Sequence, residues 1–102
     1  MKFEIAPKET EIEANWYDAR LYCFTLNIDG KVGWRLPTLE ELHKIYEIQH
    51  DFISYYYWSS TEYEVVSADA AWCHSMGIGY QCFTSKFFGS LHVRAIRDII
   101  NN

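Results

Sequence analysis

Apolar and polar residues alternate near both ends of the chain, and apolar residues recur at helical spacing between them. Phe3 and Ile5 alternate with charged neighbours, which predicts a short strand that ends before Pro7. The acidic stretch 8–13 is expected to be solvated. At the other end, residues 91–99 read as a closing strand in which Arg94 and Arg97 interrupt apolar positions.

Two helices are predicted in the first half. Asn15 suits the N-cap of the first helix, whose apolar stripe is formed by Trp16, Ala19, Cys23 and Leu26. A short strand over 32–36 follows. Thr38 and Glu41 have the spacing of a capping box, so the second helix should begin at Thr38 and end at His50 and Asp51. Its apolar face is assigned to Leu39, Leu42, Ile45, Tyr46 and Ile48.

The second half is β-prone. Residues 52–59 predict an aromatic strand, and 61–67 a polar connection. Strands over 70–76 and 79–84 should form a hairpin, with Gly77-Ile78 as a type II′ turn, before a loop over 86–90. This order predicts the α+β class, with helices on one side of a mostly antiparallel sheet.

Five motifs occur in an order that resembles the DUF1566 family, also called the Lcl C-terminal domain. They are Trp16-x-x-Ala19-x-x-x-Cys23, Gly33-Trp34-Arg35-Leu36-Pro37-Thr38-x-x-Glu41-Leu42, Tyr57-Trp58-Ser59-Ser60-Thr61, Ala71-Trp72 and Val93-Arg94-x-x-Arg97. The resemblance implies a C-type-lectin-like fold and a binding module of bacterial or phage origin. We therefore expect residues 1–102 to form one such domain, with two helices packed on a small twisted sheet. Its N- and C-terminal strands should pair, bringing Glu4 near Arg94 and Arg97 as structural ion-pair residues.

The cysteines depart from the family pattern. The family often carries a cysteine in the last strand, placed to pair with the helix cysteine, but here the stretch is Val93-Arg94-Ala95-Ile96-Arg97, so Cys23 should be a buried thiol. In the predicted hairpin Cys73 faces Cys82 as a non-hydrogen-bonded pair, within reach of a disulfide. Two neighbouring free thiols are the favoured alternative, because three cysteines cannot all pair in one chain and suit a reducing compartment.

Metal and catalytic sites lack support. Neither Pro7 nor Pro37 lies in a lectin-type calcium motif. Cys73, His74, Cys82 and His92 lack zinc-ligand spacing, and adjacent strand residues point to opposite faces. His74 is interpreted as a hydrogen-bonded histidine at the edge of the core, on the face of Trp72 and Met76. No nucleophile elbow is present, so we expect neither an enzyme nor a cofactor.

Charge and hydropathy exclude further classes. A net charge of −5 argues against nucleic acid and against anionic membranes. No apolar run is long enough for membrane insertion, and no leader is visible, which predicts a cytoplasmic or virion-associated protein.

Aromatic residues, 18% of the chain, are the best binding candidates. Alternation along a strand prevents three consecutive tyrosines at 55–57 from all facing the core. At least two phenylalanines, Phe83 and one of Phe87 and Phe88, are expected to fill the core. The predicted ligand-binding residues are Tyr55, Tyr57, Tyr80, Gln81, Phe83, Lys86, Phe87 and Phe88.

Two functions remain open. One is a phage or bacterial surface module that binds a protein or glycan and forms a homo-oligomer through a stalk. The alternative is a free-standing intracellular, phage-encoded inhibitor that blocks a host protein or sequesters a small molecule.

Overall fold

The computed structural model describes residues 2–48, 51–64 and 69–100. Two helices and eight strands follow one another in these parts of the chain, together with a 3-10 turn, Lys8–Thr10. In chain order they are β1 (Phe3–Ile5), β2 (Ile12–Ala14), α1 (Trp16–Thr25), β3 (Trp34–Arg35), α2 (Leu39–Ile48), β4 (Tyr56–Tyr63), β5 (Ala70–Ser75), β6 (Gln81–Ser85), β7 (Leu91–Val93) and β8 (Ile96–Asp98). The α+β class is confirmed.

The strands form two sheets where a single small sheet was predicted. A three-stranded sheet has the order β1-β8-β3, and a five-stranded sheet has the order β2-β7-β4-β5-β6. Every pairing is antiparallel except that of β4 with β7. The predicted pairing of the terminal strands is confirmed, since Glu4 of β1 lies opposite Arg97 of β8 and accepts from its Nη1 at 2.9 Å.

The predicted last strand divides at Arg94, where the chain leaves one sheet for the other. The buried Arg94 donates from Nε to the carbonyl of Ala6 at 2.6 Å and from Nη1 to Glu11 at 2.8 Å, while Nη2 donates to Asp51 at 2.8 Å. Arg94 is thus a structural ion-pair residue as predicted, but its partners are Glu11 and Asp51 rather than Glu4. The expectation that 8–13 is solvated holds for Lys8, Glu9 and Glu13, which are exposed, but it is wrong for Glu11, which pairs with Arg94, and for Ile12, which begins a strand.

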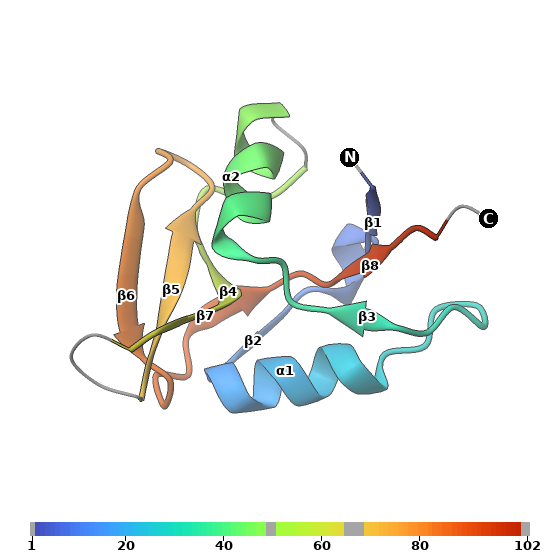
Figure 1. Cartoon of the computed structure of the whole chain (residues 1–102), viewed down its shortest axis with the longest axis horizontal. Helices are drawn as coiled ribbons and strands as arrows, with labels where there is room; N and C mark the ends of the chain where they lie inside the picture. The colour runs from blue at the N-terminus through green and yellow to red at the C-terminus, as the bar shows by residue number, and fades with distance from the viewer. Residues whose placement is uncertain (1, 49–50, 65–68, 101–102) are drawn as a thin grey trace.

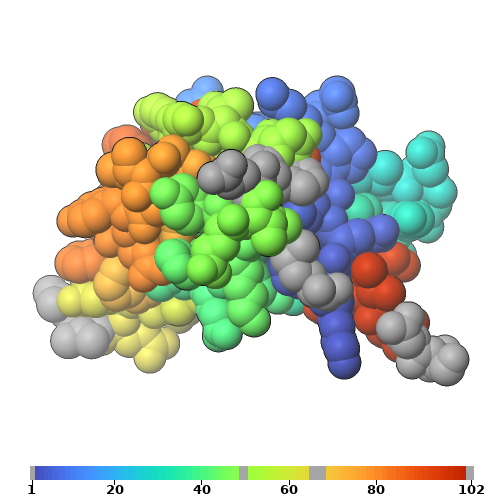
Figure 2. Space-filling model, turned by 90° about the horizontal axis from the view of Figure 1, so that it is seen from above, coloured from blue at the N-terminus to red at the C-terminus, as the bar shows by residue number. Residues whose placement is uncertain are grey.

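The two helices cover opposite faces of the five-stranded sheet, and not one side as predicted (Figure 1). Adjacent residues of a strand face opposite ways. Cys73 of β5 belongs to the buried cluster that α1 enters with Trp16, whereas the next residue, His74, hydrogen-bonds His43 of α2. Figure 2 looks onto the α2 side, where the helix lies between the β5–β6 hairpin and the terminal strands.

Both helices begin with the predicted caps. Asn15 accepts from the backbone N–H of Asp18 at 2.8 Å. Glu41 accepts from the N–H of Thr38 at 2.8 Å, and Thr38 Oγ1 accepts from the N–H of Glu41 at 3.1 Å. On the predicted apolar face of α2, Leu42 and Ile45 are buried and Ile48 is exposed. His50, placed at its end by the sequence, lies outside the described residues.

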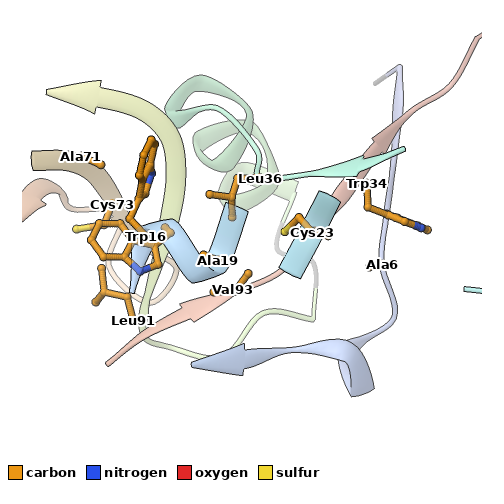
Figure 3. Packing of buried hydrophobic residues seen from close by; sticks show 12 residues of the cluster. Ala6, Trp16, Ala19, Cys23, Trp34, Leu36, Ala71, Cys73, Leu91 and Val93 are labelled. Carbon is orange, nitrogen blue, oxygen red and sulfur yellow. The ribbon is translucent and has the colours of Figure 1, made fainter. Parts of the chain in front are cut away.

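The main core lies under the inner side of α1. Figure 3 shows Trp16, Ala19 and Cys23 along this side, with Leu91 and Val93 of β7 nearby. Trp16 also donates from Nε1 to the carbonyl of Ser59 at 2.9 Å, so its one polar group is satisfied inside the core. Burial raises the pKa of the Cys23 thiol to about 12, which makes it the inert buried thiol that was predicted.

The β4 strand is displaced from the predicted range 52–59, and it takes in Thr61 to Tyr63, which were predicted as a connection. A register shift between Trp58 and Glu62 lets the strand continue past a bulge. The rest of that predicted connection, from 65 onward, lies outside the described residues.

The hairpin has the predicted register but a different turn. Cys73 lies opposite Cys82, yet the positive φ of 77° belongs to Gly79 and not to Gly77, so the type II′ turn was wrong. Ser75 donates to the carbonyl of Tyr80 at 2.8 Å, and by alternation the cysteines then form a hydrogen-bonded pair rather than the predicted non-hydrogen-bonded one. The two are free thiols with Sγ atoms 3.0 Å apart.

Candidate functional site

The outer side of α1 carries a second apolar stripe, opposite the one that enters the core. Tyr17, Leu21 and Phe24 follow one another at i, i+4 and i+7, so they are neighbours on the helix surface. Their exposed fractions are 41%, 61% and 79%. The stripe therefore contributes little to the core and stays available for contact with another molecule.

Phe87 extends this stripe beyond the helix. Its ring centroid lies 5.4 Å from that of Tyr17, and the side chain is 66% exposed. The backbone of the preceding residue, Lys86, donates to the carbonyl of Asp69 at 2.7 Å and accepts from the N–H of Trp16 at 2.9 Å. Two hydrogen bonds thus hold Phe87 beside the first turn of α1. We call Tyr17, Leu21, Phe24 and Phe87 the α1 outer face.

A cleft of about 480 Å³ opens along one side of the outer face. Its first wall is formed by α1, through Tyr17, Arg20, Leu21 and Phe24. The second wall and floor are formed by Trp34, Arg35, Leu36 and Ser60. Trp34 and Leu36 are themselves nearly buried, so the cleft ends on apolar groups that belong to the core. A cleft of this volume and lining suits one or two apolar side chains or a small molecule.

Most polar groups of the cleft already have partners. Arg35 donates from Nε, twice from Nη1 and twice from Nη2, to Asp98, Glu41 and the carbonyl of Leu36, at distances of 2.7–3.2 Å. These bonds use all the donors of a guanidinium. The hydrogen bonds of Arg35 hold the pKa of Glu41 below its usual value. Trp34 donates from Nε1 to the carbonyl of Lys31 at 2.9 Å. Both side chains therefore shape the cleft and have no donor left for a ligand.

Two of the predicted ligand-binding residues, Tyr57 and Lys86, are buried and so do not belong to an exposed binding surface. Tyr57 is fully buried and donates to Glu11 at 2.9 Å, and burial raises the pKa of its hydroxyl. Lys86 is nearly buried because its Nζ lies 4.4 Å from the centroid of Trp16 and 3.7 Å from Glu62. In both cases a buried partner draws the polar end of the side chain inward.

The remaining predicted residues are exposed but do not form one surface. Phe87 joins the α1 outer face, and Tyr55 packs on His92 with centroids 4.8 Å apart. Phe83 stacks on Tyr63 with centroids 3.8 Å apart. The prediction that Phe83 and one of Phe87 and Phe88 fill the core is wrong, since the three side chains are 46%, 66% and 48% exposed. Tryptophans at 16, 34 and 58 take that volume instead. Exposed members of the predicted set are Tyr55, Tyr80, Gln81, Phe83, Phe87 and Phe88.

The stacked rings on β4 and β6 brace the sheet. Tyr63 and Phe83 flank Trp72 of β5, which meets both edge-on at 5.3 and 5.7 Å. Tyr63 and Phe83 turn a face toward each other, so the two rings link β4 to β6, the strands on either side of β5. We therefore interpret this group as cross-strand packing.

A histidine pair lies between α2 and the sheet. The fully buried His74 has Nδ1 2.9 Å from the carbonyl of Ser75, and a carbonyl only accepts, so Nδ1 carries the proton. Nε2 of the neutral ring then accepts from Nδ1 of His43 at 3.1 Å. Burial lowers the pKa of His74, and His43 lowers it further. The predicted hydrogen-bonded histidine at the core edge is confirmed.

The family is decided by a match that runs through both sheets and both helices. Residues 4–97 match the model of the Lcl C-terminal domain. The chain belongs to this family. No curated protein matches it.

The residues that resemble the Lcl C-terminal domain pattern are mostly structural here. Trp34 forms the cleft floor, Arg35 joins β3 to Glu41 and Asp98, Leu36 enters the core, and Thr38 caps α2. The outer-face residues Tyr17, Leu21, Phe24 and Phe87 are not among those motif residues. The Lcl C-terminal domain motifs named above thus describe a scaffold, and the α1 outer face is formed by residues outside them.

Two further observations bear on this Lcl C-terminal domain. Within 2–48, 51–64 and 69–100, no three histidine, cysteine or acidic side chains come together as a metal site. Neither helix in the described part of the chain is long and apolar enough to cross a membrane. Sequence reasoning missed Tyr17, Leu21 and Phe24, although a signal existed: apolar residues remain in α1 after the inner stripe is assigned.

Proposed function

We propose that this chain is a non-catalytic, calcium-independent recognition module that binds another protein through the α1 outer face. The observation that carries the proposal is the second apolar stripe of α1. Folding does not account for it, because Trp16, Ala19 and Cys23 already supply the inner face. Exposed apolar side chains that adjoin one another are typical of protein contact sites.

The chemistry of the face favours a protein over a glycan. Leu21 and Phe24 offer apolar volume, and the cleft beside them is floored by Trp34 and Leu36. A partner that inserts apolar side chains would fill this cleft and displace water from it. A sugar needs several hydrogen-bonding groups around an aromatic ring, while Arg35 and Trp34 have committed their donors elsewhere.

The proposal includes the C-type-lectin-like fold that the family resemblance implies. The paired terminal strands and the two helices support that assignment. A partner-binding face serves both settings considered for the chain, a surface module of a bacterium or phage and a free-standing inhibitor of a host protein.

Selection from a random 12-residue peptide library tests the proposal. The wild-type protein is the bait, and the affinities of enriched peptides are measured by fluorescence anisotropy. We expect the double variant Leu21→Ser/Phe24→Ser to bind these peptides about tenfold or more weakly, the loss typical of residues at the centre of an interface.

Ile78→Ser is the matched control. Ile78 is as exposed as the outer-face residues but lies at the tip of the β5–β6 hairpin. Its replacement should leave peptide affinity unchanged. Equal affinity of the peptides for the wild type and for Leu21→Ser/Phe24→Ser would overturn the assignment of this face, and so would a library that yields no enriched sequence.

A further inference from the structure

We infer that the cleft beside α1 takes an acidic peptide segment, in which a carboxylate binds Arg20 and an adjacent aromatic or large aliphatic side chain enters the cleft. The inference rests on the proposed function and specifies the partner's chemistry. It follows from the open hydrogen-bond donors of Arg20 and from the donors of Arg35, which are all used within the protein.

Arg20 is the cation of the cleft whose hydrogen-bonding groups remain open. It lies on the exposed side of α1, between Tyr17 and Phe24. No hydrogen bond or ion pair of Arg20 occurs among the residues that the structure describes, and no acidic residue stands three or four positions away on the helix. Arg35, by contrast, has used every donor.

A cation–π contact with Trp16 holds the guanidinium of Arg20 without using its N–H donors. The Cζ atom lies 4.8 Å from the ring centroid of Trp16. At this distance the cation–π attraction holds the guanidinium over the ring and uses none of its N–H groups as hydrogen-bond donors. A guanidinium held in this way can accept a carboxylate with little further loss of side-chain freedom.

The apolar part of the site fits the neighbour of that carboxylate. Trp34 and Leu36 line the same cleft as Arg20, so a ligand that reaches all three must carry a charged and an apolar group close together. An Asp or Glu beside an aromatic or large aliphatic residue has this form. A basic segment would bring like charge to Arg20, and the residues that line the cleft include no carboxylate to bind it.

Two small probes with the same ring but different charge test the site: 3-phenylpropanoate and its neutral amide, 3-phenylpropanamide. Each is titrated into ¹⁵N-labelled protein and followed by two-dimensional NMR. Signals of residues 17–24 and 34–36 should shift with both probes, and the carboxylate should bind about fivefold more tightly, the upper range for a partly exposed ion pair.

Two variants, each lacking one positive charge on a different helix, distinguish a local contact of the probe with Arg20 from an effect of the protein's net charge. Arg20→Gln should bring the carboxylate probe down to the affinity of the amide. Lys44→Gln removes the same charge from the exposed side of α2 and should leave the preference intact. Equal binding of the two probes to the wild type, or a preference that persists in Arg20→Gln, would overturn the inference.

The peptide selection supplies the second arm. Enriched sequences should carry Asp or Glu next to an aromatic or large aliphatic residue, and changing that acid to its amide should weaken binding to the wild type but not to Arg20→Gln. If the enriched peptides bind Leu21→Ser/Phe24→Ser more weakly than the wild type but contain no acidic residue, this inference is contradicted and the proposed function is still supported. If they bind the double variant and the wild type equally well, both are contradicted.

Discussion

The two helices are the same length, ten residues each, and both begin with a capped first turn, yet they differ in what they show to solvent. The outward side of α2 is charged: Glu40 and Lys44 form an i, i+4 pair with 3.7 Å between Nζ and Oε1. The outward side of α1 shows Tyr17, Leu21 and Phe24. Apart from the exposed Ile48 in its last turn, the surface of α2 is thus explained by folding and solubility, whereas that of α1 is not, which is why we assign function to α1.

Removing an inner-face anchor should have the largest effect on stability, and a similar one in both helices. Trp16→Ala should lower the free energy of unfolding by about 3–5 kcal/mol and Leu42→Ala by about 2–5 kcal/mol, because each leaves a cavity in a close-packed core. Urea denaturation followed by circular dichroism measures both. A loss below about 1 kcal/mol in either variant would contradict the core assignment.

Cap removal should have the next largest effect, again the same for the two helices. Asn15→Ala removes the acceptor for the N–H of Asp18, and Thr38→Ala the acceptor for the N–H of Glu41. Each variant should lose about 1 kcal/mol in the free energy of unfolding. Asn15→Asp and Thr38→Ser keep the acceptor and should retain most of the stability, which distinguishes capping from a general effect of substitution.

Acid should weaken the contact between His43 of α2 and His74 of β5, and no equivalent contact is expected to weaken at α1. The loss of stability should be spread over a range of pH. The pKa of His74 is lowered in the folded protein, so the unfolded chain binds the proton more readily. The stability that neutral His74 contributes is therefore present above its ordinary pKa of about 6.5 and is lost as the pH falls through the lower folded-state value.

Urea midpoints measured from pH 7.5 down to pH 5 test this expectation. The fall should be shallower in His74→Gln, because glutamine does not take up a proton in that range. An unchanged slope would show that the pH dependence arises elsewhere.

The smallest effect on stability should come from the α1 outer face. Leu21→Ser and Phe24→Ser should each change the free energy of unfolding by less than about 0.5 kcal/mol, because the side chains are solvated in the free protein. The same urea titration measures this. A loss comparable to Leu42→Ala would mean that the stripe supports the fold, and the contrast between the helices would disappear.

The sequence predicted what local rules and family motifs control. Asn15 and the Thr38–Glu41 pair mark both helix starts because a cap needs only residues close in sequence. The cysteine register followed from counting outward from the turn. The terminal strand pairing and the buried Cys23 were also predicted correctly.

What the sequence did not predict depends on distant partners. Arg94 divides the last strand where it turns inward to pair with Glu11 and with the half-exposed Asp51, and no local pattern shows that these distant residues meet. Lys86 looks like a loop cation until its Nζ is found over Trp16. The α1 outer face was missed because a helix with apolar residues on two sides has no clear polar side from which to infer orientation.

The two backbone hydrogen bonds of Lys86 bear on which side chains of this protein can change during evolution. Since Phe87 is positioned by main-chain bonds to Asp69 and Trp16, the identity of its side chain is not required to keep it in place. The same holds for Leu21 and Phe24, whose positions are set by a helix anchored from its other side. A lineage could therefore exchange these residues, and with them its binding partner, while inheriting the scaffold unchanged.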